Sequence, residues 1–202
     1  MPHTTFGLLK AIRSHQIDSP NVAAQLRSGR PQACNLCHLD KTLAWTADQL
    51  HEWYGQPVPP LSEQQESVSA MVLDVLSGDA GQRAIASWHM GWEPALETAG
   101  REWIAPCLLE RLNDPYPAVR YNAIRSLRKL PGFHNFEFDF STVADADLWR
   151  EGRKLWEDAF AKSGKQRPSD GPLLFDESGK LQDSKVRVLS AGRDDRPVDL
   201  LE

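Results

Sequence analysis

The middle of the chain alternates apolar helical faces with proline and glycine breaks, and this pattern restricts the fold more than any other feature. Between residues 63 and 131, apolar side chains recur at three- and four-residue spacing, the period of a helix that buries one face. The breaks divide this segment into two helix pairs, at roughly 63–90 and 95–131. Pairs repeating about every 35 to 40 residues predict a stack of helical hairpins, because each hairpin buries its apolar face against the next.

The second pair contains the run NDPYPAVRYNAIRSL, residues 113–127, with an Asp-Pro turn, a Val-Arg step and an alanine at the helix crossing. This run resembles a HEAT-like repeat, and the alternative is a generic helical hairpin. The resemblance implies that Arg120 hydrogen-bonds back toward the turn aspartate, Asp114. We also expect Asp114 to cap the helix and Pro115 to take its first position.

Two of the three cysteines stand in the run ACNLCH, residues 33–38, where His38 follows the second cysteine directly. This C-x-x-C-H spacing is the attachment motif of c-type haem. Cys34 and Cys37 would bond the two vinyl groups of the porphyrin, and His38 would bind the iron.

Three alternatives to a haem site stay open at this motif. A structural zinc site needs four ligands, and the sequence offers one cysteine pair, a distant Cys107 and scattered histidines. A thioredoxin-like dithiol needs a βαβ setting, which the neighbouring sequence does not predict. The third alternative is coincidence. Cys107 falls on the apolar face of a predicted helix, where a free cysteine behaves as a small buried hydrophobe.

Residues 1–55 resemble a segment of multihaem c-type cytochromes, proteins that often join haem motifs to helical repeats. The matching pieces are Met1-Pro2, Arg13-Ser14-His15, Pro20, Gly29-Arg30-Pro31, Ala33 to Lys41, Trp45 and Trp53-Tyr54-Gly55. The resemblance implies haem c as cofactor and electron transfer as function, with a redox partner protein or neighbouring haem domains as partners. In that family another haem motif precedes Met-Pro, so the resemblance also implies that this chain is part of a larger multihaem protein. It implies a periplasmic or extracytoplasmic location, although no export signal is visible here.

The resemblance extends to residues around the haem. A haem that transfers electrons usually has two axial ligands. We expect His15 to be the second one, because it matches the histidine before proline in the family. His3 is the next choice. Arg13 and Arg30 are expected to pair with the haem propionates, because guanidinium suits carboxylate.

Three aromatic residues follow the motif closely in sequence: Trp45, Trp53 and Tyr54. They could pack against the porphyrin, as we expect for Trp45. The alternative is that they form the contact between the haem segment and the first repeat. The run LDKTLAWTADQLHEWYG predicts a helix that ends at Gly55, with Tyr54 on its apolar face.

Charge and composition exclude some classes of function. The net charge is −5 and no block of lysine or arginine stands out, so nucleic acid is a poor candidate partner. No apolar run is long enough to span a membrane. The sequence contains no Ser/His/Asp arrangement, phosphate loop or HExxH motif, so it predicts no catalytic residues, and an enzyme with an open haem iron stays an alternative.

The sequence therefore predicts a mainly α fold in three parts. Residues 1–58 form an irregular haem-binding segment, residues 59–165 a HEAT-like helical-repeat domain, and residues 166–202 a tail that packs on the body. In the tail, strand-like runs at 173–175 and 186–189 flank the turn DESGK, which predicts a small β-hairpin. The predicted function is electron transfer through one covalent haem, and the alternative is a HEAT-like protein-interaction scaffold without redox activity.

Overall fold

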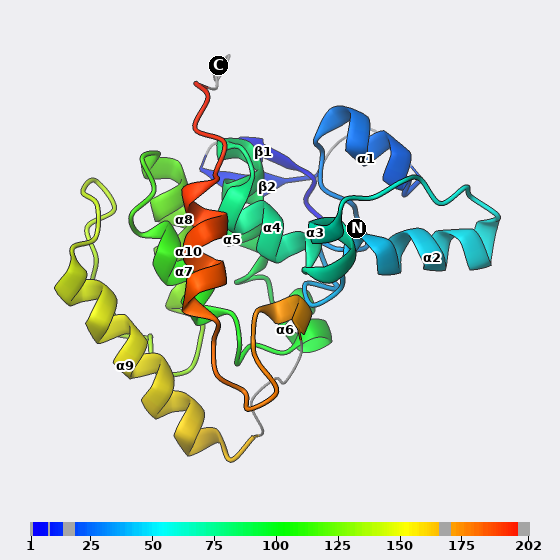
Figure 1. Cartoon of the computed structure of the whole chain (residues 1–202). Coiled ribbons are helices and arrows are strands. Elements are labelled where there is room, and N and C mark those ends of the chain that lie inside the picture. The colour runs from blue at the N-terminus through cyan, green and yellow to red at the C-terminus, as the bar shows by residue number, and fades with distance from the viewer. Residues whose placement is uncertain (1, 8, 14–18, 166–170, 198–202) are drawn as a thin grey trace.

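A computed structural model of the chain describes residues 2–7, 9–13, 19–165 and 171–197 (Figure 1). The described part is mainly helical, as predicted, and its two-stranded antiparallel sheet lies near the N-terminus. The strands are β1 (Thr5–Gly7) and β2 (Lys10–Ile12), and the helices are α1 (Val22–Ser28), α2 (Leu43–Tyr54), α3 (Glu63–Ser67), α4 (Ala70–Ser77), α5 (Ala80–His89), α6 (Glu93–Ala99), α7 (Ala105–Arg111), α8 (Pro117–Leu127), α9 (Ala146–Ser163) and α10 (Asp183–Ala191), with a 3-10 turn at Gly171–Leu173.

The hairpins α4–α5 and α7–α8 form the body of the molecule. Helix α5 packs against both α4 and α8, and α7 packs against α4, α8 and α9. Their apolar faces make one large core, to which α9 and α10 add side chains. A smaller core joins α1 and α2 to the start of α4. Helices α1 and α2 therefore lie at one side of the body and α9 at the other (Figure 1).

A buried arginine marks the same place in both hairpins. Arg83 of α5 and Arg120 of α8 each lie four residues after the N-cap residue of their helix, and a 37-residue offset relates them. Each guanidinium donates to the carbonyl oxygen five residues earlier, at 2.7 Å for Gly78 and 3.1 Å for Pro115. The two hairpins thus share this arginine position, and its offset lies within the period of 35 to 40 residues expected from the sequence.

Arg120 hydrogen-bonds back to the turn aspartate of the second hairpin, as expected. Arg120 donates to the backbone carbonyl of Asp114 at 2.6 Å. The Asp114 carboxylate accepts instead from Arg83 at 2.7 Å and from Arg111 at 3.3 Å. All four side chains are buried, so this cluster ties one hairpin to the other.

The start of α8 lies two residues later than predicted. Tyr116 is the N-cap residue and Pro117 is the first helical residue, whereas the sequence predicted a cap at Asp114. The predicted start is wrong because the Asp114 carboxylate is turned inward to the two arginines; its second oxygen accepts the backbone N–H of Tyr116 at 3.0 Å.

The tail differs from the predicted hairpin in its second half. The turn is present, and an isolated bridge pairs Phe175 with Leu181. The run 186–189, however, lies in α10. Val186 and Leu189 are buried while Val188 is 69 % exposed, a three-residue spacing that a helix buries on one face and a strand cannot. In the described ranges, no helix is long and apolar enough to cross a membrane.

Candidate haem-binding site

The C-x-x-C-H run forms a tight turn that separates its residues into an inner and an outer set. The backbone N–H of His38 donates to the Cys34 carbonyl at 2.9 Å. Asn35 and Leu36, the two residues between the cysteines, are completely buried, whereas Cys34, Cys37 and His38 are half-exposed. The turn therefore presents both thiols and the imidazole outward together.

Hydrogen bonds of the buried Asn35 hold this turn against α2. Its side-chain nitrogen donates to the Lys41 carbonyl at 3.1 Å, and its side-chain oxygen accepts from the Thr46 hydroxyl at 2.8 Å. The Ser69 hydroxyl, at the start of α4, donates to the Leu39 carbonyl at 2.6 Å. The turn is thus fixed to both the helix beside it and the helical body, so the site does not depend on a free loop.

The outward side chains of the turn and one face of α2 enclose an open groove of about 280 Å³. On α2, Trp45, Gln49 and Trp53 recur every four residues, which places them on one face of the helix. The His38 and Trp45 rings lie with their centroids 5.1 Å apart. The groove is lined by Ala33, Cys34, Cys37, His38, Trp45, Thr46, Gln49 and Trp53.

The two thiols of the groove are free, and burial raises the pKa of each above its ordinary value. A redox dithiol depends on a lowered thiol pKa, so the environment of Cys34 and Cys37 does not resemble such a site. No group of three or more His, Cys, Asp or Glu side chains within the described residues is arranged to hold a metal ion. Two free thiols and an imidazole on one apolar groove do fit the donor set of a covalently attached haem.

Cys107, the third cysteine, is 2 % exposed on α7. Burial raises the pKa of its thiol to about 12. It behaves as the small buried hydrophobe that the sequence predicted.

His3 lies in a different aromatic cluster, at the end of α5. Its ring centroid is 4.5 Å from that of Trp88 and 5.5 Å from that of Trp92. Its backbone N–H faces the Nε2 atom of the buried His89 at 3.4 Å, and burial lowers the pKa of His3. The structure does not bring His3 to the groove of His38. His15, the preferred second ligand, lies outside the described residues.

The two predicted propionate partners are also away from the groove lining. Arg13 is exposed, and its charge helps to lower the pKa of His3, which places it near the His3 cluster. Arg30 is exposed and lines two other pockets. Of the predicted site residues in the described ranges, the structure therefore brings together Cys34, Cys37, His38 and Trp45.

The aromatic residues of α2 divide between two surroundings. Trp53 lines the groove and is 58 % exposed, whereas Tyr54 is 72 % exposed and does not line the groove. The sequence predicted Tyr54 on the apolar face of this helix, and this prediction is wrong. The apolar face consists of Leu43, Ala47 and Leu50. Sequence reasoning missed Gln49, although its place midway between the two tryptophans, four residues from each, was visible.

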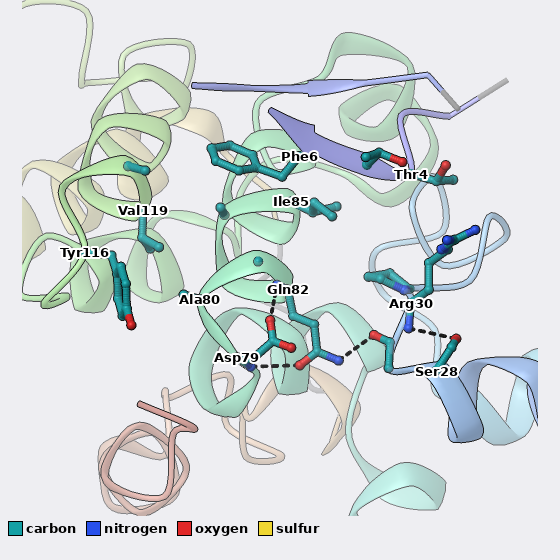
Figure 2. Close-up of a pocket in the computed structure, with 16 residues that line it drawn as sticks. Thr4, Phe6, Ser28, Arg30, Asp79, Ala80, Gln82, Ile85, Tyr116 and Val119 are labelled. Atoms are coloured by element: carbon teal, nitrogen blue, oxygen red, sulfur yellow. Dashed lines mark hydrogen bonds between the residues drawn. The ribbon is translucent and has the colours of Figure 1, made fainter. Parts of the chain in front are cut away.

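A second pocket, also of about 280 Å³, lies between the two hairpins and β1 (Figure 2). Phe6, Ile85 and Val119 give it an apolar wall, and Asp79 and Tyr116 stand on its polar side. Gln82, in the α5 capping box, donates to the Gly29 carbonyl at 2.7 Å. This contact joins α1 to the body. The sequence did not predict this pocket, because its walls come from four distant segments.

Comparison with protein families identifies one segment of the chain. A family model described as HEAT repeat matches residues 104–130, which contain α7, the turn with Asp114 and α8. Comparisons with curated proteins and with solved structures give no match. The α7–α8 hairpin is therefore a HEAT-like repeat, in agreement with the resemblance of residues 113–127.

Proposed function

We propose that the chain is an electron-transfer module that carries one covalent c-type haem on a helical-repeat body. One observation carries the proposal. Cys34, Cys37 and His38 line one groove together while the two residues between the cysteines are turned into the core. The C-x-x-C-H spacing needs this arrangement, because both sulfurs and the histidine must reach the same ring.

The chain's own residues would hold the haem in defined roles. Cys34 and Cys37 would hold the porphyrin through thioether bonds, each formed by addition of the S–H group across one vinyl group. His38 would bind the iron and His15 is the proposed second ligand; with two histidine ligands the iron would be low-spin, with a lower potential than a His/Met pair gives. When bound, the haem supplies one-electron transfer, and Trp45 lines the wall of the groove beside His38.

Partners and location follow from the same proposal. The resemblance of residues 1–55 to multihaem cytochromes supports neighbouring haem domains or a redox partner protein as the source and acceptor of electrons. Haem is attached to this motif outside the bacterial cytoplasm, so we propose a periplasmic or extracytoplasmic location.

The test is optical. Protein is produced with a cytochrome c maturation system, denatured, extracted to remove free haem, and examined as the pyridine haemochrome. We expect a covalent haem spectrum that disappears in the Cys34→Ala/Cys37→Ala variant. Protein made without maturation is the control and should be folded but colourless. A folded wild-type protein without covalent haem, produced beside a cytochrome that matures normally, would contradict the proposal.

The second candidate function is a protein-interaction scaffold, favoured by the pocket between the hairpins (Figure 2). Stacked helical repeats commonly use surfaces of this kind to bind partners. The Cys34→Ala/Cys37→Ala variant separates the two functions. If the folded variant binds a partner as the wild-type protein does and no haem attaches to the wild type, the scaffold is favoured.

A further inference from the structure

The groove wall formed by α2 has a feature that the attachment motif does not explain. Helix α2 buries Leu43, Ala47 and Leu50 in the smaller core. A second stripe, Trp45, Gln49 and Trp53, runs along a different side and faces the groove. The helix therefore carries apolar surface on its core side and large aromatic rings on its groove side.

Trp53 stands at the end of this stripe with 58 % of its surface exposed. Leaving so large an aromatic ring in water forgoes the stabilisation that its burial gives. No other tryptophan of the described residues is exposed to this degree: Trp103 and Trp156 are buried, and the others are half-buried. Trp53 is therefore a surface that a bound group would cover.

The arrangement of the groove indicates which kind of group would cover Trp53. The stripe begins at Trp45, which lies beside the ring of His38. It ends eight residues later, about 12 Å along the helix axis at 1.5 Å per residue. Cys34 and Cys37 are on the same groove. A flat, apolar ring bonded to these two sulfurs and placed against His38 would lie in the groove that this stripe lines, which a partner protein need not do.

We propose that Trp53 covers one side of the attached porphyrin and shields it from water. This inference rests on the proposed haem and deepens it, because it assigns the outer wall of the site. Tyr54, the next residue, is 72 % exposed and does not line the groove. Tyr54 therefore provides a neighbouring aromatic residue outside the groove lining, which we expect to stay exposed and which serves as the control.

Hydroxyl-radical footprinting read by mass spectrometry measures both residues at once. The haem-loaded wild type is compared with the haem-free Cys34→Ala/Cys37→Ala variant. We expect modification of Trp53 to fall several-fold on loading while modification of Tyr54 stays the same.

Covalent haem with unprotected Trp53 would overturn the inference and leave the proposed function standing. Equal protection of Trp53 and Tyr54 would also overturn the inference, because it would mean that a second protein chain, rather than the porphyrin, covers this end of the helix. Absence of covalent haem would remove the proposed function and this inference together.

A second measurement uses the loaded protein and two variants. Trp53→Ala opens one side of the ring to water, which favours the more charged oxidised iron, so we expect a lower midpoint potential than in the wild type. Tyr54→Ala should leave the potential unchanged. An unchanged potential in Trp53→Ala, with haem content retained, would contradict the shielding role.

Discussion

Asp114 joins the two hairpins through buried charges. Its carboxylate accepts from Arg83 of α5 and from Arg111 of α7, and all three side chains are buried. Burial lowers the pKa of Arg111 to about 10, so this guanidinium is charged at neutral pH. Removal of one partner from a buried ion pair leaves uncompensated charge in the core, which costs far more than the net stabilisation that the pair contributes.

Asp114→Ala should therefore lower the free energy of unfolding by about 3–5 kcal/mol. The control is Asp147→Ala, which removes the exposed partner of Arg150 and should cost at most about 1 kcal/mol. Urea unfolding followed by circular dichroism measures both variants. Similar losses in the two would show that the buried cluster does not hold the hairpins together.

Asp74 gives the stability a pH dependence that a simple substitution can remove. Burial raises its pKa to about 8, with the charge of Asp79 as a second cause. Because the folded pKa lies above the unfolded value, the stabilisation from Asp74 is complete below pH 4 and is lost as the pH rises to about 8. His89 acts in the opposite direction: burial lowers its pKa to about 4, so stability falls as the pH drops from 6.5 toward 4.

Asp74→Asn should therefore be more stable than the wild type at pH 8, by a margin that grows by up to about 1.4 kcal/mol per pH unit above pH 4. Asp48→Asn, at an exposed position of α2, is the control and should show no such growth. Urea unfolding at pH 5, 6, 7 and 8 gives the result. A constant difference across this range would mean that Asp74 is ionised in the folded protein.

The two candidate histidines for the second axial position give different expectations in the loaded protein. In protein loaded with haem as proposed, His15→Ala should give a high-spin spectrum where the wild type gives a low-spin one, because the proposed second ligand is removed. His3→Ala should leave the spin state unchanged, because His3 packs between Trp88 and Trp92. A methionine-to-iron charge-transfer band in the wild type, or a high-spin spectrum only in His3→Ala, would contradict this assignment.

Individual helices were predictable where the apolar spacing led up to a glycine stop. Helix α2 begins after Thr42, whose hydroxyl accepts from Trp45 N, and it ends at Gly55 with φ 66°. Leu43, Ala47 and Leu50 are buried with the expected spacing, whereas Tyr54 is exposed. Helix α10 was missed because the short run 186–189 is rich in β-branched and aliphatic residues, and only packing against α4 shows which of them are buried.

Helix α9 docks on α7 at a glycine, and sequence alone could not show this contact. A Cβ atom at Gly152 would overlap the side chain of Leu109, which is fully buried. Helix propensity predicts that Gly152→Ala gains about 1 kcal/mol. Overpacking a filled core costs about 1–3 kcal/mol.

We therefore expect Gly152→Ala to destabilise the protein by about 1 kcal/mol, against the propensity scale. Glu151→Ala, at the exposed neighbouring position, is the control and should change stability by less than about 0.5 kcal/mol. Thermal unfolding compares the two. A higher melting temperature for Gly152→Ala would show that α9 does not approach α7 so closely.

In the whole molecule, the helical fold and the HEAT-like hairpin at 104–130 were visible in the sequence, but the contacts between the C-x-x-C-H segment and the helices were not. The motif spacing singled out Cys34, Cys37 and His38, and Trp45 was singled out because it follows the motif closely in sequence. The Asn35 hydrogen bonds, the hydrogen bond from Ser69 to the turn and the position of His3 depend on contacts between residues 6 to 86 positions apart. No local pattern records such contacts.

The central claim is that Cys34 and Cys37 hold one haem covalently. Intact-mass spectrometry of the denatured protein, produced with a cytochrome c maturation system, tests it most directly. We predict that the wild-type chain carries the added mass of one haem and that the Cys34→Ala/Cys37→Ala variant carries none. An unmodified mass for folded wild-type protein, in cells where a control cytochrome acquires its haem, would contradict the account.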